Sequence, residues 1–480
     1  MWADNSFHCR ALALSVGLAA FCLFGGCGAP QEESGAVHPV FFPPAPEKPR
    51  LQFLKSFGGE ADLGIAGPGG LEKFVLGEAE QKEGITTPYG LALFDGKLYV
   101  CDVGKRRVEV LDLTKRSFGY MTEDRRLVNP VNICIEEDGT KYVADPTVGA
   151  VFVFDAGNTL QAILGKDSQI RPIDVAVRGP HCYVTDYAGN RVVVLDKSTG
   201  KEIRRIGEQG DGDTQFKLIS DLTFGPDGDL YVTDKIKARI FQFDPSGNLK
   251  RTIGRRGDNV DEFVRPKGIA VDSANRMWVI DSGVSLSPSL WSTEVAKIYD
   301  SQGRLLLFFG GPGNEPSNMN LPAKIILDSR HVDLFRPYAV KGANIEFLVL
   351  VSNQYGSNKV SVYGFGEFPV QSRPKEVAQK PPVEKAPASE SASPARPAPA
   401  APPKAEPTGD DAEQLPQIKA IAEVYYSSME QYRAGRLEEA RAGFVKVITS
   451  GLVPPPMEQT LRGYVKDIDS RLARARRAKP

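Results

Sequence analysis

Three residues with oxygen-bearing side chains, Asn132, Asp174 and Asp221, stand at equivalent places in successive stretches of the chain, in the runs PVN, PID and ISD. An amide and two carboxylates are the kind of ligands that a hard cation such as Ca²⁺ takes in proteins. If the fold brings the three together, they form a candidate calcium site. The elements that carry them must therefore be identified first.

A short phrase recurs along the chain, with a hydrophobic pair followed one residue later by Asp. It ends at five aspartates, 41 to 48 residues apart: Asp102, Asp145, Asp186, Asp234 and Asp281. Each repeat also contains four apolar runs of four to six residues, rich in Val, Ile, Phe and Tyr and separated by turns such as Asp-Gly and Ser-Gly. Such runs indicate strands, so each repeat predicts a four-stranded antiparallel sheet.

A four-stranded repeat of this length is typical of a propeller blade, which needs a neighbour on each face. The sequence predicts a mainly β fold with six blades over residues 51–368. The last blade is degenerate, with Ser352-Asn353 in place of the usual Asp, and lacks a fourth strand. The segment QFLKSF, Gln52 to Phe57, matches the fourth-strand pattern and is predicted to close the ring by pairing with the end of the chain's last blade.

The pattern P-x-G-I-A-V-D, Y-V-x-D, R-I-x-x-F-D-x-x-G and a strand ending in G-x-x-G resembles the NHL repeat, and the resemblance covers roughly residues 51–368. The lead-in FFPPAPEKPRLQFLKSF also looks like that of bacterial lipoproteins with a six-bladed NHL-type propeller. The resemblance implies a rigid propeller that acts as a binding platform.

In a propeller the first strand of each blade lies nearest the axis, and six residues are expected to share one level of the central channel: Gly90, Asn132, Asp174, Asp221, Gly268 and Lys324. The candidate Ca²⁺ site would use Asn132, Asp174 and Asp221, and gluconolactonase-like propellers carry a comparable oxygen-ligand site. Alternatively, Lys324 neutralises the ring without a metal. The five repeated aspartates are expected to accept backbone N–H groups in the turns that follow them.

Other catalytic groups are sparse. Only His38, His181 and His331 remain after signal removal, and they are too scattered for the zinc site of NHL-like peptide-amidating lyases. The cysteines Cys101, Cys134 and Cys182 lie in strands and are predicted to be small buried hydrophobes, with a Cys101–Cys134 disulfide as the alternative in an oxidising compartment.

Residues 1–26 are predicted to be a signal peptide, because ALALSVGLAAFCLFGG is apolar but too short to span a membrane. The small residues before Cys27 resemble the lipobox of bacterial lipoproteins, which implies acylation of Cys27. An ordinary secretory signal is the alternative. Gly28 in place of Asp resembles lipoproteins sorted to the outer membrane, and residues 27–50 are predicted to form a proline-rich tether.

Residues 369–413 are rich in Pro, Ala and Glu and are predicted to be a disordered linker. Residues 414–480 have helical periodicity and resemble one tetratricopeptide (TPR) unit, with a third helix that covers its apolar stripe; the alternatives are that the propeller or a partner does so. Three arginines are predicted to face an acidic protein partner: Arg433, Arg436 and Arg441. The linker's length predicts that the two modules bind independently.

The formal net charge of −1 over 480 residues argues against nucleic acid as a partner. We therefore expect a protein of the bacterial cell envelope, anchored by its N-terminal lipid, that binds protein partners without catalysis. The competing hypothesis is a Ca²⁺-dependent hydrolase or lyase of the gluconolactonase-like type, with a small substrate in the channel.

Overall fold

The computed structural model describes residues 39–64, 83–257, 259–283, 294–313, 315–369, 421, 424–425, 427–428, 431–432, 436–451 and 455–477. The predicted signal peptide, the cysteine predicted to be acylated, Cys27, and most of the predicted linker lie outside these residues. The described part of the chain contains no helix that is both long and apolar enough to cross a membrane.

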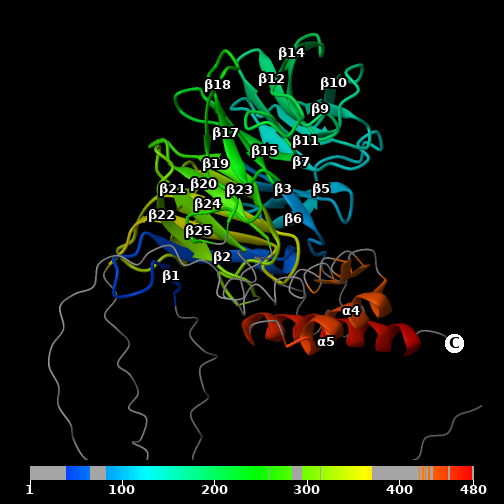
Figure 1. The fold of residues 1–480 in the computed structure, drawn as a ribbon, viewed down its shortest axis with the longest axis vertical. Coiled ribbons are helices and arrows are strands. Elements are labelled where there is room, and N and C mark those ends of the chain that lie inside the picture. Colours follow the sequence, from blue (N-terminus) through cyan, green and yellow to red (C-terminus); the bar gives the residue numbers. More distant parts are fainter. Residues whose placement is uncertain are drawn as a thin grey trace, which may run out of the picture. The chain divides into compact units, whose positions relative to one another are not determined.

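Six sheets form six blades around a central axis (Figure 1). Blade one contains β3 (Pro88–Phe94), β4 (Lys97–Asp102), β5 (Arg107–Asp112) and β6 (Ser117–Tyr120). Blade two contains β7 (Asn132–Ile135), β8 (Lys141–Asp145), β9 (Ala150–Phe154) and β10 (Leu160–Leu164). Blade three contains β11 (Pro172–Arg178), β12 (His181–Asp186), β13 (Arg191–Asp196) and β14 (Glu202–Ile206).

Blade four contains β15 (Ile219–Phe224), β16 (Leu230–Asp234), β17 (Arg239–Phe243) and β18 (Leu249–Ile253). Blade five contains β19 (Pro266–Val271), β20 (Met277–Asp281), β21 (Val295–Tyr299) and β22 (Leu305–Gly310). Blade six contains β23 (Pro322–Asp328), β24 (Asn344–Asn353), β25 (Val360–Glu367), β2 (Leu51–Phe57) and β1 (Phe41–Phe42). The predicted six-bladed propeller is confirmed.

The ring is closed by the N-terminal strand, as predicted. β2 pairs antiparallel with β25, from Leu51 opposite Phe365 to Phe57 opposite Val360. Figure 1 shows this blue strand beside the last strands of the propeller. Part of the predicted tether is also ordered in the sheet, because β1 pairs with β2 and adds a fifth strand at the outer edge.

An insertion in blade six holds the closing strand. It contains α2 (Val332–Phe335) and the 3₁₀ turn η2 (Arg336–Tyr338). The buried side chain of Gln52 donates to the carbonyl of Tyr338 at 3.1 Å and accepts from the N–H of Val340 at 3.0 Å. A second 3₁₀ turn, η1 (Glu60–Leu63), follows β2.

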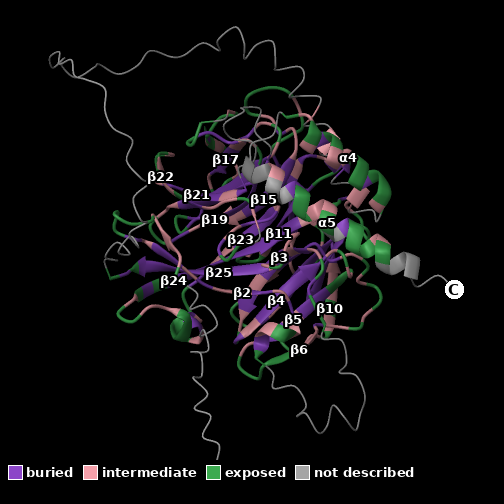
Figure 2. Ribbon diagram, turned by 90° about the horizontal axis from the view of Figure 1, so that it is seen from below, coloured by how far each residue is buried: buried purple, intermediate pink, exposed green. Residues whose placement is uncertain are grey.

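The middle strands are buried on both faces, as expected for sheets packed between sheets. All five residues of β9, AVFVF, are buried, and so are the four central residues of β13. Figure 2 shows that buried residues dominate the strands, whereas exposed residues gather in the loops and on the helices. The hydrophobic core is therefore distributed between neighbouring blades.

The C-terminal segment forms a helical module with α4 (Leu437–Thr449) and α5 (Pro455–Arg477), and helical residues also occur between 421 and 432. The apolar side of α4, with Ala440, Phe444 and Val447, packs against Leu461 and Ile468 of α5. The predicted third helix thus packs on the apolar side of α4.

Candidate functional site

The first strands of neighbouring blades contact one another around the ring and line the central channel. Lys324 on β23 reaches across this channel to two aspartates. Its Nζ lies 3.1 and 3.0 Å from the two carboxylate oxygens of Asp174 and 2.7 Å from Oδ1 of Asp221. The exposed fractions of Asp174 and Asp221 are 1 % and 3 %, so this ion cluster is almost free of bulk water.

The charged groups of the cluster shift one another's pKa values. Burial works against the ammonium, but the two carboxylates outweigh it and hold the pKa of Lys324 above its ordinary value. Burial, followed by the negative charge of Asp174, raises the pKa of Asp221 well above its ordinary value, although Lys324 opposes the shift. The physical reason is that one ammonium cannot neutralise two buried carboxylates.

With Lys324 in place, the donor set does not fit a calcium ion. Asp174 also accepts the N–H groups of Val175 at 2.9 Å and Leu222 at 2.8 Å, so its oxygens are already used. The amide oxygen of Asn132 accepts the N–H of Ile133 at 3.0 Å. Among the residues described, no group of three or more His, Cys, Asp or Glu side chains is placed to hold a metal. A cation at the predicted position would have to displace the Lys324 ammonium.

The side-chain amide of Asn132 places an unsatisfied hydrogen-bond donor in the channel wall. Its Nδ2 is buried and has no acceptor in the described part of the chain. Its neighbour Gly90 is required for close approach, because a Cβ there would lie 2.4 Å from Oδ1 of Asn132. Since a buried donor without a partner costs about 1–3 kcal/mol, this amide is suited to a water or a ligand oxygen.

Gly268 plays the matching role between blades five and six. A Cβ on Gly268 would lie 2.6 Å from the carbonyl oxygen of Ala323, the residue before Lys324. The backbone N–H of Lys324 is fixed by Ser352, whose hydroxyl accepts it at 3.0 Å and donates to the carbonyl of Tyr89 at 2.6 Å. All six predicted channel residues thus lie on neighbouring first strands or the turns leading into them.

Sequence reasoning missed two residues associated with the channel cluster. Tyr89 has a raised pKa, owing first to burial and then to the charges of Asp221 and Asp174. Lys235 has its pKa lowered to about 8 by burial and then by the positive charge of Arg265. The signal for these residues was available, because Tyr89 directly precedes Gly90 and Lys235 directly follows Asp234.

The first four repeated aspartates each bind two loops. The carboxylate of Asp102 accepts the N–H groups of Thr86 and Thr87 before the blade and those of Gly104 and Lys105 after the strand. The same double pattern occurs at the three following positions, Asp145, Asp186 and Asp234. Asp281 accepts from Val264, Arg265 and the Lys297 ammonium. These carboxylates tie each blade to the loop from the preceding one.

In blade six Asn353 takes this place. Its side-chain oxygen accepts the N–H of Asn320 at 3.2 Å, and its Nδ2 donates to the carbonyl of Asn358 at 2.7 Å. The amide therefore supplies one acceptor for the incoming loop and one donor for the turn that follows.

The described cysteines and histidines have surroundings that give no sign of reactivity. Cys101, Cys134 and Cys182 are free, so the alternative Cys101–Cys134 disulfide is not formed. Burial raises the pKa of Cys134 to about 11, which disfavours the thiolate. His331 pairs with Asp328 at 2.9 Å, and His181 starts β12.

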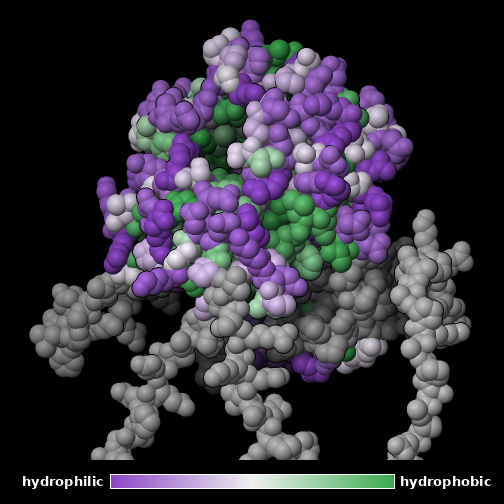
Figure 3. All heavy atoms as spheres, turned by 90° about the vertical axis from the view of Figure 1, so that its left-hand side faces the viewer, coloured by the Kyte–Doolittle hydropathy of each residue, from purple (hydrophilic) through white to green (hydrophobic). Residues whose placement is uncertain are grey.

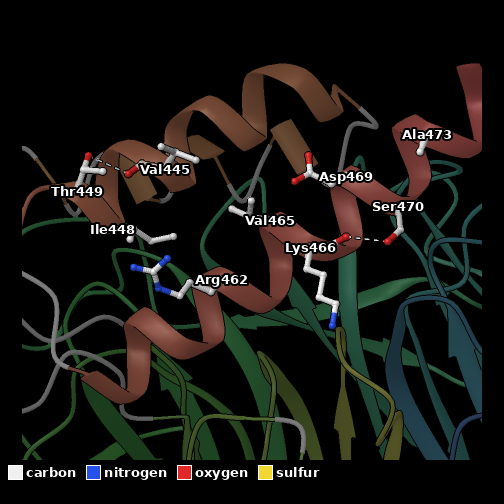
Figure 4. Close-up of a pocket in the computed structure, with 9 residues that line it drawn as sticks. All are labelled: Val445, Ile448, Thr449, Arg462, Val465, Lys466, Asp469, Ser470 and Ala473. Atoms are coloured by element: carbon white, nitrogen blue, oxygen red, sulfur yellow. Dashed lines mark hydrogen bonds between the residues drawn. The ribbon is translucent and has the colours of Figure 1, made fainter.

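The arginines predicted to face an acidic partner are paired within the helical module. Nε of Arg441 lies 2.6 Å from Asp469, and Nε of Arg436 lies 2.9 Å from Glu439; Arg433 lies outside the described residues. Asp469 is also part of an open groove of about 590 Å³ between α4 and α5 (Figure 4). Figure 4 shows Arg462 and Lys466 along α5 beside this groove, with Val465 between them.

The helical module is not independent of the propeller, which corrects the expectation from the linker's length. The hydroxyl of Tyr464 on α5 donates to the side-chain oxygen of Asn320 at 2.7 Å. The ring of Tyr355, from a blade-six loop, lies 6.2 Å from that of Tyr432 and joins the module's core. The propeller therefore contributes an aromatic side chain to the module's core.

We expect Glu294→Gln to reduce the pH dependence of the protein's free energy of unfolding. Burial raises the pKa of Glu294 to about 7, against the opposing effects of the Leu321 N–H and Lys267. Because this value exceeds that of an unfolded Glu, about 4.3, the folded state binds the extra proton and stability falls as pH rises from 5 to 8. Between pH 5 and pH 8 the free energy of unfolding should therefore decrease by about 2 kcal/mol less in the variant than in the wild type.

Urea unfolding of the protein lacking residues 1–38, at pH 5 and pH 8, measures this difference. Glu367→Gln is the control, because Glu367 is exposed and pairs with the exposed Lys48. If Glu294→Gln and Glu367→Gln keep the same pH dependence, Glu294 is ionised throughout this range.

Comparisons with known proteins agree with the fold. A family model described as a 6-bladed beta-propeller matches residues 213–286. The chain is a six-bladed β-propeller. It is similar to a structural genomics protein of unknown function from Bacteroides thetaiotaomicron, with 13 % identity, a TM-score of 0.46 and coverage of 66 % of this chain and 76 % of the other.

Two further solved propellers are similar at the same distant level. Virginiamycin B lyase from Staphylococcus aureus has 15 % identity and a TM-score of 0.41, with 58 % of this chain and 82 % of the lyase covered. The calcium-binding protein regucalcin from Agrobacterium tumefaciens has 13 % identity and a TM-score of 0.41, with 59 % and 91 % covered. Similarity at this level concerns the fold.

Proposed function

We propose that this protein is a lipid-anchored component of the bacterial cell envelope whose NHL-type propeller and TPR-like helical module bind protein partners without catalysis. The observation that carries the proposal is the position of Lys324. Its ammonium fills the space between Asp174 and Asp221, where a calcium-dependent hydrolase or lyase would need an open coordination position. The same contact removes both carboxylates from service as a general base, since a base must be free to accept a proton from substrate.

Exposed apolar side chains on the propeller support a binding role. On the outer strand β22, the exposed fractions of Leu306 and Phe308 are 54 % and 49 %. Figure 3 shows the side of the propeller that carries β21 and β22 in Figure 1, where hydrophobic surface interrupts a mostly hydrophilic exterior. An edge strand of this kind is usually protected by charges, so exposed Leu and Phe favour contact with another protein.

Replacement of Cys27 by Ser tests both anchoring and binding in the cell. We expect the wild-type protein to partition into the detergent phase and to give discrete crosslinked species in isolated envelopes. The Ser variant should appear in the aqueous phase or remain unprocessed, because a serine cannot take the thioether-linked lipid, and the crosslinked species should decrease strongly.

Cys101→Ser is the matched control, since Cys101 is buried inside β4. If Cys27→Ser partitions and is processed like wild type, the protein is not anchored through this residue. If wild-type envelopes give no discrete crosslinked species, the binding function is wrong.

A further inference from the structure

We propose that a pocket between blades two and three binds an acidic peptide segment with apolar side chains. The pocket has a volume of about 760 Å³. The residues that matter here are two cations and four apolar or aromatic residues: Lys166, Arg171, Val148, Ile170, Ile173 and Tyr187. This proposal rests on the protein-binding function proposed above and names the chemistry of the partner.

The pocket lies on one defined face of the propeller. Its walls come from the loops after β8 and β12 and from the loop between β10 and β11. In an antiparallel four-stranded blade, the loop after the second strand and the loop to the next blade emerge at the same face. Ile173 directly precedes Asp174, so the inner wall of the pocket adjoins the central channel.

The two cations are available to a ligand. Neither the Lys166 ammonium nor the Arg171 guanidinium makes a hydrogen bond or ion pair with the residues that the structure describes, and both residues are exposed. Nearby cations differ, since Lys197 pairs with Glu136 at 2.7 Å and Arg191 with Asp186 at 3.2 Å. Unpaired cations beside a cavity attract carboxylates.

The rest of the pocket is apolar. The exposed fractions of Tyr187 and Val148 are 46 % and 37 %, while Ile170 is buried and Ile173 is half-buried. Asp145 and Asp186 directly precede lining residues of the pocket. Their carboxylates accept backbone N–H groups. A suitable ligand therefore combines negative charge with apolar side chains, which an acidic peptide provides and a sulfated polysaccharide does not.

Exposed apolar surface also occurs outside the pocket. On the equivalent loop of blade four, the side chain of Ile236 is also exposed. An extended segment can contact both the pocket and this second apolar side chain, which a compact small molecule cannot.

The probe for this site is a fluorescein-labelled peptide of alternating glutamate and leucine, titrated with the protein lacking residues 1–38 and followed by fluorescence anisotropy. Lys166→Ala combined with Arg171→Ala should weaken binding about tenfold, because two charge-assisted contacts are lost. Tyr187→Ala should weaken it about threefold through lost apolar contact.

The matched control is Lys115→Ala combined with Lys201→Ala. These lysines are exposed in the turns between the third and fourth strands, which emerge at the opposite face, and this variant should bind like wild type. A peptide of alternating glutamine and leucine should bind much more weakly than the acidic peptide. All variants are checked for unchanged melting temperature.

Three results would overturn the proposal: equal affinity of the Lys166 and Arg171 variant, equal binding of the glutamine peptide, or preferential binding of dextran sulfate. None of these results by itself overturns the protein-binding function proposed above, which is tested separately. If the Lys166 and Arg171 variant still gives the wild-type crosslinked species in envelopes, protein binding stands and uses another surface.

Discussion

Replacement of Lys324 by Met is expected to lower the free energy of unfolding by about 3–5 kcal/mol at pH 7. The substitution removes the ammonium that lies within 3.1 Å of two buried carboxylates and leaves their repulsion uncompensated. Chemical denaturation of the protein lacking residues 1–38 measures the loss. Calcium should partly restore the variant, because the vacated position then joins the oxygens of Asp174 and Asp221, while it should leave the wild type unchanged.

The pH dependence of this variant has a definite sign. Lys324 opposes the upward shift in the pKa of Asp221, so without it this pKa rises further above that of the unfolded chain and the folded state takes up a proton. Stability should therefore increase as pH falls from 8 towards 5, more steeply than in the wild type.

Lys297→Met is the matched control. Lys297 is also buried and lies 2.8 Å from a single carboxylate, Asp281, which accepts backbone N–H groups as well. This variant should lose stability without gaining a response to calcium. A wild type whose melting temperature rises with calcium would favour the Ca²⁺-dependent enzyme and contradict the role assigned to Lys324.

Removal of the closing strand is expected to abolish cooperative folding. A chain that begins at Gly59 lacks β2 and the buried side chains of Leu51, Leu54 and Phe57. Full burial of such a side chain contributes about 1.5–3 kcal/mol, so the three together approach the whole stability of a typical domain. The loss also exposes the edge of β25, which then becomes a site for aggregation.

The comparison chain begins at Pro39 and retains both β1 and β2. Thermal unfolding followed by circular dichroism should show one sharp transition for this chain and none for the shorter one. Truncation after Pro369 should cost much less, because the propeller keeps all six blades and, among the residues described, loses contacts at Asn320 and Tyr355. If the chain from Gly59 melts at the same temperature as the chain from Pro39, β2 is not essential to the ring.

Local patterns in the sequence were sufficient for the propeller. The strand signals around each repeated Asp and the displaced fourth-strand pattern at Gln52 to Phe57 depend on alternation, turn residues and repeat length, which are properties of neighbouring residues. The level of the channel was also predictable, because residues at one register of a repeat meet at the axis.

The chemistry of that channel was decided by the tertiary structure. The sequence left two alternatives for Asn132, Asp174 and Asp221, a cation or neutralisation by Lys324, because side-chain reach across a ring cannot be read from spacing. The structure places the Lys324 ammonium between Asp174 and Asp221. It also joins residues far apart in the chain that no local pattern connects, as at Tyr464 and Asn320.

The sequence by itself determined the number of blades, the closing strand and the structural role of the repeated aspartates, since these follow from a repeated local code. Only the tertiary structure decided that both channel carboxylates pair with Lys324, that the propeller contacts the helical module and that Lys166 and Arg171 share a pocket. The physical reason is that these features depend on distances between side chains from different blades, which the packing of the whole ring sets.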